Sequence, residues 1–316
     1  MLSTKIQAIA FASLALIIIV VGVKDFSERE NIRNNSPRTV SSEKKLEMDP
    51  RALLQDPPQK TVKVPAKPVK PLISAEAYLV GNVETGEIYI QHNPQSVFPI
   101  ASLSKLVTAM IAMHSMKSDQ KITITQSMLD AYGDAGHLVL GETFTVSELL
   151  YPLLLESSND AAEAIAEGFG FDAFISSMNS FVKEIKMAST GFKDSSGLSS
   201  SNFSNADDLF TLSRYLYANE KSLLDLSRLS KMELASTTEH GGHTFLTINP
   251  FPGDPHFIGG KTGRTIEAKE SMISLFSYPQ DGKIYPIAII VLRSDWSTRE
   301  IDSSILFEQA IAKIGK

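Results

Sequence analysis

Residues 98–115 most constrain what this chain can fold into, because apolar side chains recur in them with the period of an α-helix. The apolar positions are Leu103, Leu106, Val107, Met110 and Ile111. Their i, i+3, i+4, i+7 and i+8 spacing marks one stripe along a helix. The sequence therefore predicts a helix here with one buried face.

Two reactive side chains, Ser102 and Lys105, lie in the first turn of this predicted helix. Residues three apart share a helix face. A hydroxyl is a weak nucleophile until a base removes its proton, and an amine kept neutral by burial or by a second cation is such a base. The helix N-terminus also favours negative charge on Ser102. Since Ser-x-x-Lys occurs five times in the chain, its meaning depends on what accompanies it.

The composition is that of a globular protein and excludes several classes of function. Of 316 residues, 43% are hydrophobic, enough for a sizeable core. A net charge of −6 without a long basic run gives no electrostatic footprint for nucleic acid. The absence of cysteine excludes disulfides, thiolate nucleophiles and cysteine-based metal sites.

Residues 1–24 are predicted to anchor the chain in a membrane. The run 6–23 contains only two polar residues, Gln7 and Ser13, and is close to the shortest helix that spans a bilayer. A cleaved signal peptide is the alternative. It is less favoured because bulky residues fill the end of the run, where small residues would mark a cleavage site.

Residues 25–72 are predicted to be a linker between this segment and a folded domain. They hold seven of the 15 prolines, many charges and few apolar residues, and such a composition cannot bury a core. We expect the folded domain to occupy residues 73–316.

The order of predicted elements in this domain indicates one antiparallel sheet interrupted by helices. Two β-rich runs within 76–92 flank turn residues and predict a hairpin. From residue 98 to about 235 the signals are mostly helical. Three strands are predicted over 257–264, 271–276 and 285–292, and a helix over 298–314. This order favours an α/β chain of the α+β type, with a five-stranded sheet built from both ends of the domain and flanked by helices.

Capping signals predict helix boundaries near residue 157. Thr145 and Glu148 match a capping box, and Pro152 should kink or shorten the helix that follows. Asn159 is placed to cap a second helix, 160–167, which Gly168 would end.

Three short motifs stand in order on these predicted elements. Ser102-Leu-Ser-Lys105 opens a helix, Ser157-Ser-Asn159 lies between helices, and Lys261-Thr-Gly263 lies in a strand. Ser-x-Asn alone is weak, since it also occurs at Ser177 and Ser200. The set of three resembles the signature of the penicillin-recognising serine enzymes.

Within that group the chain resembles the low-molecular-mass penicillin-binding proteins, the D-alanyl-D-alanine carboxypeptidases. The likeness covers about residues 73–316 and includes the segments 79–86, 145–162, 192–198 and 204–209. It implies a β-lactamase/DD-peptidase-like fold and removal of the terminal D-alanine from peptidoglycan stem peptides during cell-wall synthesis. It also implies covalent inhibition by β-lactams, no cofactor or metal, and a place on the outer face of a bacterial cytoplasmic membrane.

The resemblance implies a catalytic role for each motif residue. Ser102 would attack the carbonyl between two D-alanines and form an acyl-enzyme, and Lys105 would take its proton. Lys261 would lower the pKa of the Lys105 amine as a second cation. Ser157 would pass a proton to the leaving amine, and Asn159 would hold a backbone amide of the substrate.

The same resemblance implies a substrate-binding set. Thr262 and Arg299 would bind the terminal carboxylate, for which a guanidinium is well suited. Gly263 would allow the strand to approach the ligand closely. The backbone N–H groups of Ser102 and Arg264 would form an oxyanion hole. Arg264 departs from the family pattern, which often has an aromatic residue or histidine at this position.

The sequence alone leaves several alternative functions to be weighed. The family also contains D-alanyl-D-alanine endopeptidases, which cleave cross-links, so the substrate is less defined than the reaction. A class A β-lactamase would use a glutamate between the second and third motifs, but residues 185–219 contain none. A non-catalytic penicillin sensor would carry a signalling domain or lack a motif. His240 and His243 have no third ligand at a recognisable spacing, so they do not predict a zinc site.

Overall fold

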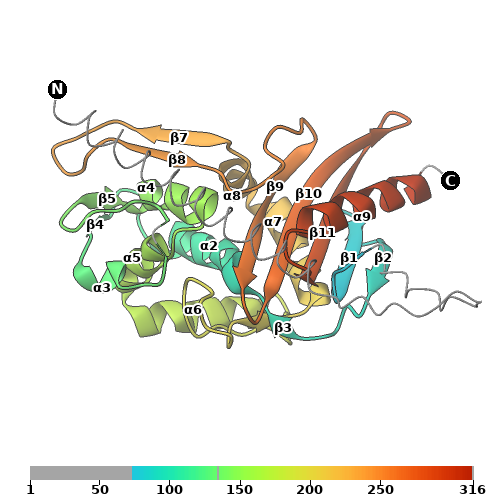
Figure 1. Cartoon of the computed structure of the whole chain (residues 1–316), viewed down its shortest axis with the longest axis horizontal. Helices are drawn as coiled ribbons and strands as arrows, with labels where there is room; N and C mark the ends of the chain where they lie inside the picture. Colours follow the sequence, from blue (N-terminus) through green and yellow to red (C-terminus); the bar gives the residue numbers. More distant parts are fainter. Residues whose placement is uncertain (1–72, 134, 315–316) are drawn as a thin grey trace, which may run out of the picture. The chain divides into compact units, whose positions relative to one another are not determined.

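A five-stranded antiparallel sheet lies at the centre of the computed structural model, which describes residues 73–133 and 135–314. The strands lie in the order β2-β1-β11-β10-β9 (Figure 1). Their bounds are β1 Ala77–Asn82, β2 Ile88–His92, β9 Phe257–Thr265, β10 Lys269–Gln280 and β11 Lys283–Ser294. The predicted hairpin, the three C-terminal strands and the sheet built from both ends of the domain are confirmed.

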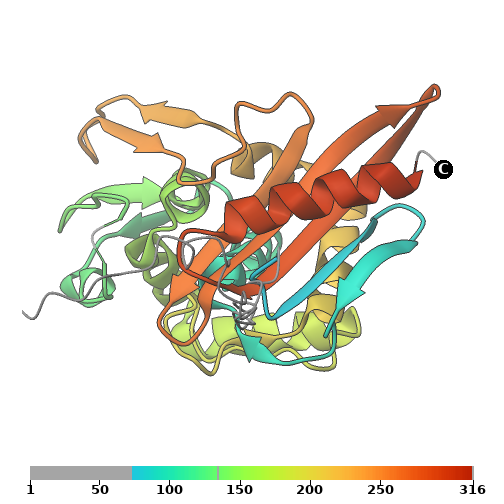
Figure 2. The same ribbon diagram turned by 45° about the vertical axis from the view of Figure 1, so that its right-hand side comes forward.

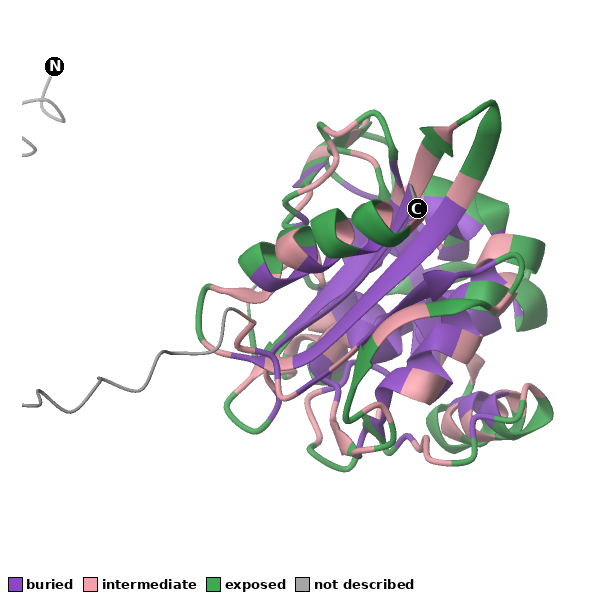
Figure 3. Ribbon diagram, turned by 90° about the vertical axis from the view of Figure 1, so that its right-hand side faces the viewer, coloured by how far each residue is buried: buried purple, intermediate pink, exposed green. Residues whose placement is uncertain are grey.

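Successive side chains of the central strands face two different cores, because they alternate across a sheet. In β11, Ile289 packs in one core with Leu306 of helix α9 (Arg299–Ile314), which lies across the sheet in Figure 2. Its neighbour Ile290 belongs to a larger core shared with the other helices. Figure 3 shows β10 and β11 buried over much of their length, as expected for strands covered on both faces.

The helices between β2 and β9 form the layer on the other face. Their bounds are α2 Lys105–Ser115, α3 Gln126–Leu129, α4 Val146–Tyr151, α5 Asn159–Phe169, α6 Phe171–Glu184, α7 Ala206–Asn219 and α8 Lys221–Ser227. Helix α7 contacts β1, β10 and β11, and α8 contacts β9. The predicted helix at 98–115 is confirmed over α2, but the chain enters it through a short strand, β3 Phe98–Pro99, and a 3-10 turn, η2 Ala101–Ser104.

Three two-stranded ribbons in the insertion had no clear sequence signal. Strand β3 pairs with β6 (Phe203–Ser204), β4 (Lys121–Thr123) with β5 (Thr143–Thr145), and β7 (Lys231–Leu234) with β8 (His243–Leu246). The last ribbon borders the site, since Leu246 N–H donates to Glu156 and Ile248 N–H donates to the Leu155 carbonyl.

The capping box at Thr145 is confirmed. Its hydroxyl accepts a hydrogen bond from Glu148 N–H at 3.2 Å, while the Glu148 carboxylate accepts one from Thr145 N–H at 2.8 Å. Pro152 shortens α4 as predicted, since its ring removes an N–H donor. The chain then continues as a π-helical turn, η3 Pro152–Glu156.

The predicted boundaries of α5 are wrong at both ends. Ser158 caps the helix in place of Asn159, and its hydroxyl accepts the Ala161 N–H at 3.1 Å. The helix also runs through Gly168 to Phe169 and is capped by Gly170, whose φ of 106° suits glycine. Because the helix starts one residue earlier than predicted, the Asn159 side chain is available for other contacts.

The predicted anchor and linker, residues 1–24 and 25–72, lie outside the described residues. Among the helices within 73–133 and 135–314, none is both long and apolar enough to cross a bilayer.

Candidate active site

Ser102 and Lys105 meet where the 3-10 turn η2 passes into α2. Lys105 Nζ donates a hydrogen bond of 3.0 Å to Ser102 Oγ. Ala101, just before the serine, has a φ of 48°, a strained value for a residue with a side chain. The turn therefore places the hydroxyl and the amine side by side, as the Ser-x-x-Lys spacing predicted.

The Lys105 amine is fully buried and has three hydrogen-bond acceptors. Besides Ser102 Oγ, it donates to Asn159 Oδ1 at 2.7 Å and to the Ser196 carbonyl at 2.6 Å. Burial lowers its pKa from 10.5 to about 7, although the nearby carboxylates of Asp194 and Glu163 act in the opposite direction. Burial penalises the charged form of a lysine, so this amine is a base suited to neutral pH.

A second hydroxyl–amine pair, Ser157 and Lys261, lies close to the first. Lys261 Nζ, from β9, donates to Ser157 Oγ at 2.8 Å and to the Thr262 carbonyl at 2.9 Å. Burial lowers the pKa of Lys261 well below its usual value, and the charges of Lys105 and Arg299 lower it further. Burial is thus the main cause of the low pKa at both amines, and the mutual effect of the two lysine charges adds to it at Lys261.

Ser157 holds an unusual backbone conformation, with a φ of 63° and a ψ of 33° at the end of the π-helical turn η3. A left-handed conformation costs a residue with a side chain about 1 kcal/mol or more. Such strain is maintained only where surrounding structure fixes it, and it is concentrated at functional sites. Here it separates η3 from α5 and places Ser157 Oγ against Lys261.

Asn159 links the Lys105 amine to the backbone of Tyr132. Its Oδ1 accepts from Lys105, and its Nδ2 donates to the Tyr132 carbonyl at 2.5 Å. An amide nitrogen carries two N–H donors, so this side chain keeps donor capacity toward the cleft. Its first-turn position in α5 follows from the Ser158 cap described above.

The C-terminal part of β9 packs directly against the turn that carries the nucleophile. A Cβ added to Gly263 would lie 2.8 Å from the Ile100 carbonyl oxygen and 3.3 Å from Ser102 N. Gly263 was expected to allow close approach of a ligand; in the structure, the close neighbour is the backbone of residues 100–102. Only glycine fits there, and its presence brings residues 262–264 alongside Ser102.

Two guanidinium groups share one buried carboxylate beside this strand. Arg299 donates to the Gly263 carbonyl at 3.2 Å and lies 4.0 Å from the Glu270 carboxylate. Arg264 lies 3.8 Å from the same Glu270 oxygen. Burial lowers the pKa of Arg299, and Glu270 opposes this effect. The Glu300 carboxylate also acts on Arg299, so two cations, with two carboxylates nearby, lie beside Thr262.

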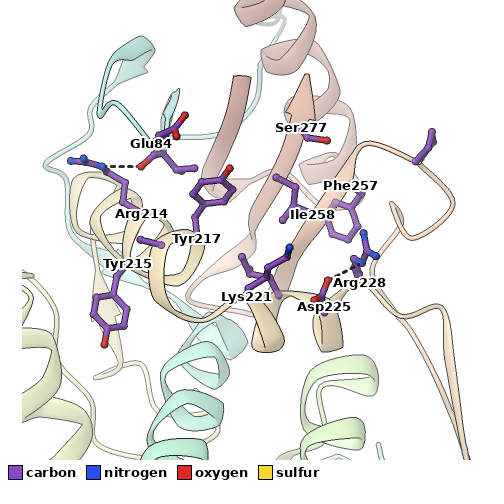
Figure 4. A pocket seen from close by; sticks show the side chains of 14 residues that line it. Glu84, Arg214, Tyr215, Tyr217, Lys221, Asp225, Arg228, Phe257, Ile258 and Ser277 are labelled. Carbon is purple, nitrogen blue, oxygen red and sulfur yellow. Dashed lines mark hydrogen bonds and ion pairs between the residues drawn. The ribbon is translucent and has the colours of Figure 1, made fainter. Parts of the chain in front are cut away.

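Seven of the nine predicted residues line two adjoining hollows, whereas the buried Lys105 and Lys261 line neither. The narrower, about 300 Å³, is lined by Ser102, Ser157, Ile248, Thr262, Gly263, Arg264 and Arg299. The wider, about 690 Å³, shares Ser102, Ser157 and Arg264 and continues toward Asn159 and Trp296. A larger hollow of about 940 Å³, lined by Arg214 and Tyr217 among others, contains none of the predicted site residues (Figure 4). Size alone therefore does not mark the site.

The loop 193–199 is a part of the site that the motifs did not identify. The Asp194 carboxylate accepts N–H bonds from residues 196, 197 and 199, which fixes the Ser196 carbonyl that faces Lys105. Asn202 ties this loop to the nucleophile helix, since its Nδ2 donates to Ser104 Oγ at 3.1 Å. The sequence signals for it were the segment 192–198, which belongs to the family likeness, and Ser200-Ser-Asn202, which was discounted as a weak Ser-x-Asn.

The two histidines with glycines between them pair with glutamates. His243 Nε2 lies 3.1 Å from the Glu142 carboxylate, and His240 Nε2 lies 3.4 Å from that of Glu148. Across residues 73–133 and 135–314, no group of three or more His, Cys, Asp or Glu side chains is placed to hold a metal ion. These pairs dock the β7–β8 ribbon onto β5 and α4.

Comparison with known proteins agrees with this geometry. A family model described as D-alanyl-D-alanine carboxypeptidase matches residues 61–290. A D-alanyl-D-alanine endopeptidase of Haemophilus influenzae is 35% identical over 160 residues, covering 49% of this chain and 54% of the relative. One of Escherichia coli is 31% identical over 147 residues, covering 45% and 47%. The chain thus matches about half the length of these relatives.

A solved structure gives the same result over most of the domain. Penicillin-binding protein D2 of Listeria monocytogenes, in its ampicillin-bound form, is 30% identical with a TM-score of 0.66, covering 76% of this chain and 98% of that one. The family model alone spans well over half of the chain. With the hydroxyl–amine pairs at Ser102 and Ser157, this match shows that the chain belongs to the D-alanyl-D-alanine carboxypeptidase family.

Proposed function

We propose that this chain is a serine DD-peptidase that removes the terminal D-alanine of peptidoglycan stem peptides through an acyl-enzyme on Ser102. One observation carries the proposal: a buried Lys105 amine with a pKa of about 7 lies 3.0 Å from Ser102 Oγ. Such an amine is partly neutral near neutral pH and can accept the hydroxyl proton. Ser102 Oγ then attacks the carbonyl carbon between the two D-alanines.

The developing oxyanion would be stabilised by the backbone N–H groups of Ser102 and Arg264. The close packing of Gly263 against Ser102 N supports this pairing, because it brings the two segments of backbone together. Preorganised donors of this kind are worth roughly 3–4 kcal/mol of barrier each in serine peptidases.

The second pair would complete the acylation step. As the C–N bond breaks, Ser157 gives its proton to the leaving D-alanine nitrogen, and Lys261 replaces that proton through the 2.8 Å hydrogen bond. Asn159 would hold a backbone amide of the substrate. Water then attacks the ester carbonyl and its proton passes to Lys261, while Lys105 returns its proton to Ser102 Oγ as the acid product leaves.

The terminal carboxylate of the substrate would lie in the narrower hollow, near Thr262 and Arg299. The two guanidinium groups beside Glu270 supply cationic partners for an anion there. A guanidinium also matches a carboxylate in shape and can bind it through two N–H groups.

Cleavage of peptidoglycan cross-links is a second candidate activity. It is favoured by the relatives of 35% and 31% identity that are named D-alanyl-D-alanine endopeptidases. Incubation with a pentapeptide stem and with a cross-linked dimer, followed by mass spectrometry, separates the activities. Loss of one D-alanine from the pentapeptide supports the main proposal. Exclusive conversion of the dimer to monomers favours the second activity. If neither product forms, both proposals are contradicted.

The nucleophile can be tested with labelled penicillin, since we propose that β-lactams acylate Ser102. The ampicillin-bound relative supports this choice of probe. Ser102→Ala should abolish labelling while the thermal unfolding curve stays close to wild type. Ser180→Ala is a matched control, because Ser180 also begins a Ser-x-x-Lys spacing but is exposed on α6. Labelling that persists in Ser102→Ala would contradict the assignment.

We also propose that residues 6–23 anchor the chain and that the catalytic domain works on the outer face of a bacterial cytoplasmic membrane. The apolar run supports this placement. Full-length protein should then remain in the membrane fraction with its N-terminus at Met1 or Leu2. A soluble mature chain that begins near Val23 would show that the segment is a cleaved signal peptide.

A further inference from the structure

Glu270 is a buried carboxylate beside the narrower hollow, and the proposed mechanism gives it no role. It lies in β10, pairs with Arg264 of β9 across the sheet, and is only 3% exposed. A buried carboxylate is costly unless hydrogen bonds and opposite charges compensate it. The contacts of its two oxygens show which groups this residue holds in place.

The two Glu270 oxygens contact different parts of the segment that carries Arg299. Oε2 accepts a hydrogen bond from the Ser297 N–H at 3.0 Å. Ser297 lies two residues before Arg299, the first residue of α9, and has a φ of 63°. Surrounding structure must maintain this conformation in a residue with a side chain. Oε1 lies 4.0 Å from Arg299 Nη1. Glu270 therefore holds both the backbone that leads into Arg299 and its guanidinium.

The Arg299 guanidinium has few other contacts that fix its position. Nη1 donates to the Gly263 carbonyl at 3.2 Å, whereas Nε is buried and has no hydrogen-bond partner within residues 73–133 and 135–314. A long side chain loses conformational entropy when a ligand binds, unless a neighbour has already ordered it. Glu270 supplies this order, although its Oε1 is shared with Arg264, whose Nη1 lies 3.8 Å away.

We infer that Glu270 is a positioning residue, which orients Arg299 toward the terminal carboxylate of the substrate without itself contacting the substrate. This role rests on the proposed function, because it requires that Arg299 binds that carboxylate. A carboxylate accepts hydrogen bonds at both oxygens, whereas a glutamine amide has an acceptor on one side only. Glutamine at residue 270 would leave either the Ser297 N–H or the Arg299 guanidinium facing an NH2 group. Aspartate would keep the charge, but its side chain is one methylene shorter.

The test measures kcat and KM of the full-length enzyme for a pentapeptide that ends in two D-alanines. Glu270→Gln should lower kcat/KM by about 3- to 10-fold, mainly through a higher KM, as expected for the loss of one ordering contact to a binding group. Glu270→Asp is the second variant and should act in the same direction, because the shorter carboxylate cannot reach both partners. Thermal unfolding is followed for each variant.

Glu300→Gln is the matched control for charge. Glu300 adjoins Arg299, and its carboxylate also acts on the charge of that residue, but the side chain is exposed. Removal of either carboxylate makes the surroundings of Arg299 more positive, which by itself favours an anion. Glu300→Gln should therefore leave KM unchanged or lower it, whereas Glu270→Gln should raise it. A change of the same sign and size in both variants would overturn the inference.

A double-mutant cycle separates positioning from a general structural role. In the Arg299→Ala background, Glu270→Gln should change kcat/KM by less than about twofold, because residues that act through one contact are not additive. A full effect in that background, or no effect in wild type, would overturn the inference. Wild-type enzyme that cleaves the pentapeptide and is labelled by penicillin at Ser102 supports the proposed function whatever the variants do. Wild-type enzyme that does neither contradicts the proposed function, and the role of Glu270 with it.

Discussion

The rate of acylation should follow the protonation of Lys105, because only the neutral amine can take the Ser102 proton. Burial sets the pKa of this amine at about 7. The neutral fraction is then about one eleventh at pH 6 and about ten elevenths at pH 8. The second-order rate constant should rise about tenfold over this interval and level off above it. An amine with an unshifted pKa near 10.4 would give about a 100-fold rise with no plateau.

Labelled penicillin is the better probe for this profile, since opening its ring expels no separate amine. The acylation rate is measured by stopped-flow or gel labelling from about pH 5.5 to 9.5, with unfolding followed by circular dichroism at each pH. Lys105→Arg is the control, because a guanidinium stays charged and cannot act as the base. Acylation of that variant should be lost at every pH.

Removal of a neighbouring charge tests the direction in which the Lys105 pKa shifts. The Glu163 carboxylate raises the pKa of Lys105 against the effect of burial. Glu163→Gln should therefore lower the Lys105 pKa and move the rise in rate to lower pH. A wild-type rate that climbs tenfold per unit beyond pH 9, or a midpoint that moves to higher pH in Glu163→Gln, would refute the reasoning.

Three further predictions test individual contacts. Arg299→Ala should lower kcat/KM for a peptide by about 10- to 100-fold, equivalent to about 1.5–3 kcal/mol for a charged hydrogen bond, but slow penicillin acylation less; equal losses would indicate a general structural role. Gly263→Ala should cost about 1–3 kcal/mol of stability through overpacking, seen as a lower Tm, whereas Gly253→Ala, with open space around it, should not. Ser158→Ala removes the cap of α5 and should lower the unfolding free energy by about 1 kcal/mol in urea titrations; an unchanged midpoint would contradict the capping role.

The main sheet could be predicted because its strands are long and bounded by clear turns. Residues 285–292 form an unbroken apolar run, and Asp281-Gly282 joins it to β10 with both residues at positive φ. The ribbon β7–β8 could not be predicted in the same way. Its strands have four residues each, and exposed positions alternate with partly or fully buried ones, but a run of four is the shortest over which such alternation indicates a strand. The ribbon is held by contacts distant in sequence, such as Leu246 to Glu156.

The reacting side chains could be identified from sequence because each motif is local, whereas the groups that hold them come from elsewhere. Asn202 contacts Ser104 across 98 residues, and no spacing rule connects the two. Asn179, from the other discounted Ser-x-Asn, likewise binds the backbone of Phe192 through both ends of its amide. A short polar motif identifies its own residues. Its hydrogen-bond partners are distant in sequence, so only the folded structure identifies them.

The one-residue error at Asn159 shows why local rules fail at a site. Ser158 and Asn159 are both good capping residues, so helix rules alone do not choose between them. A shift of one residue turns a helical side chain by about 100°, and only the observed start directs Asn159 Oδ1 to the buried Lys105 amine. A helix cap is worth about 1 kcal/mol, whereas loss of Asn159, one of the three acceptors of the buried Lys105 amine, would leave an N–H group unpaired at a cost of about 1–3 kcal/mol, or more when charged. The tertiary contact is therefore the stronger term, and it fixes where α5 begins.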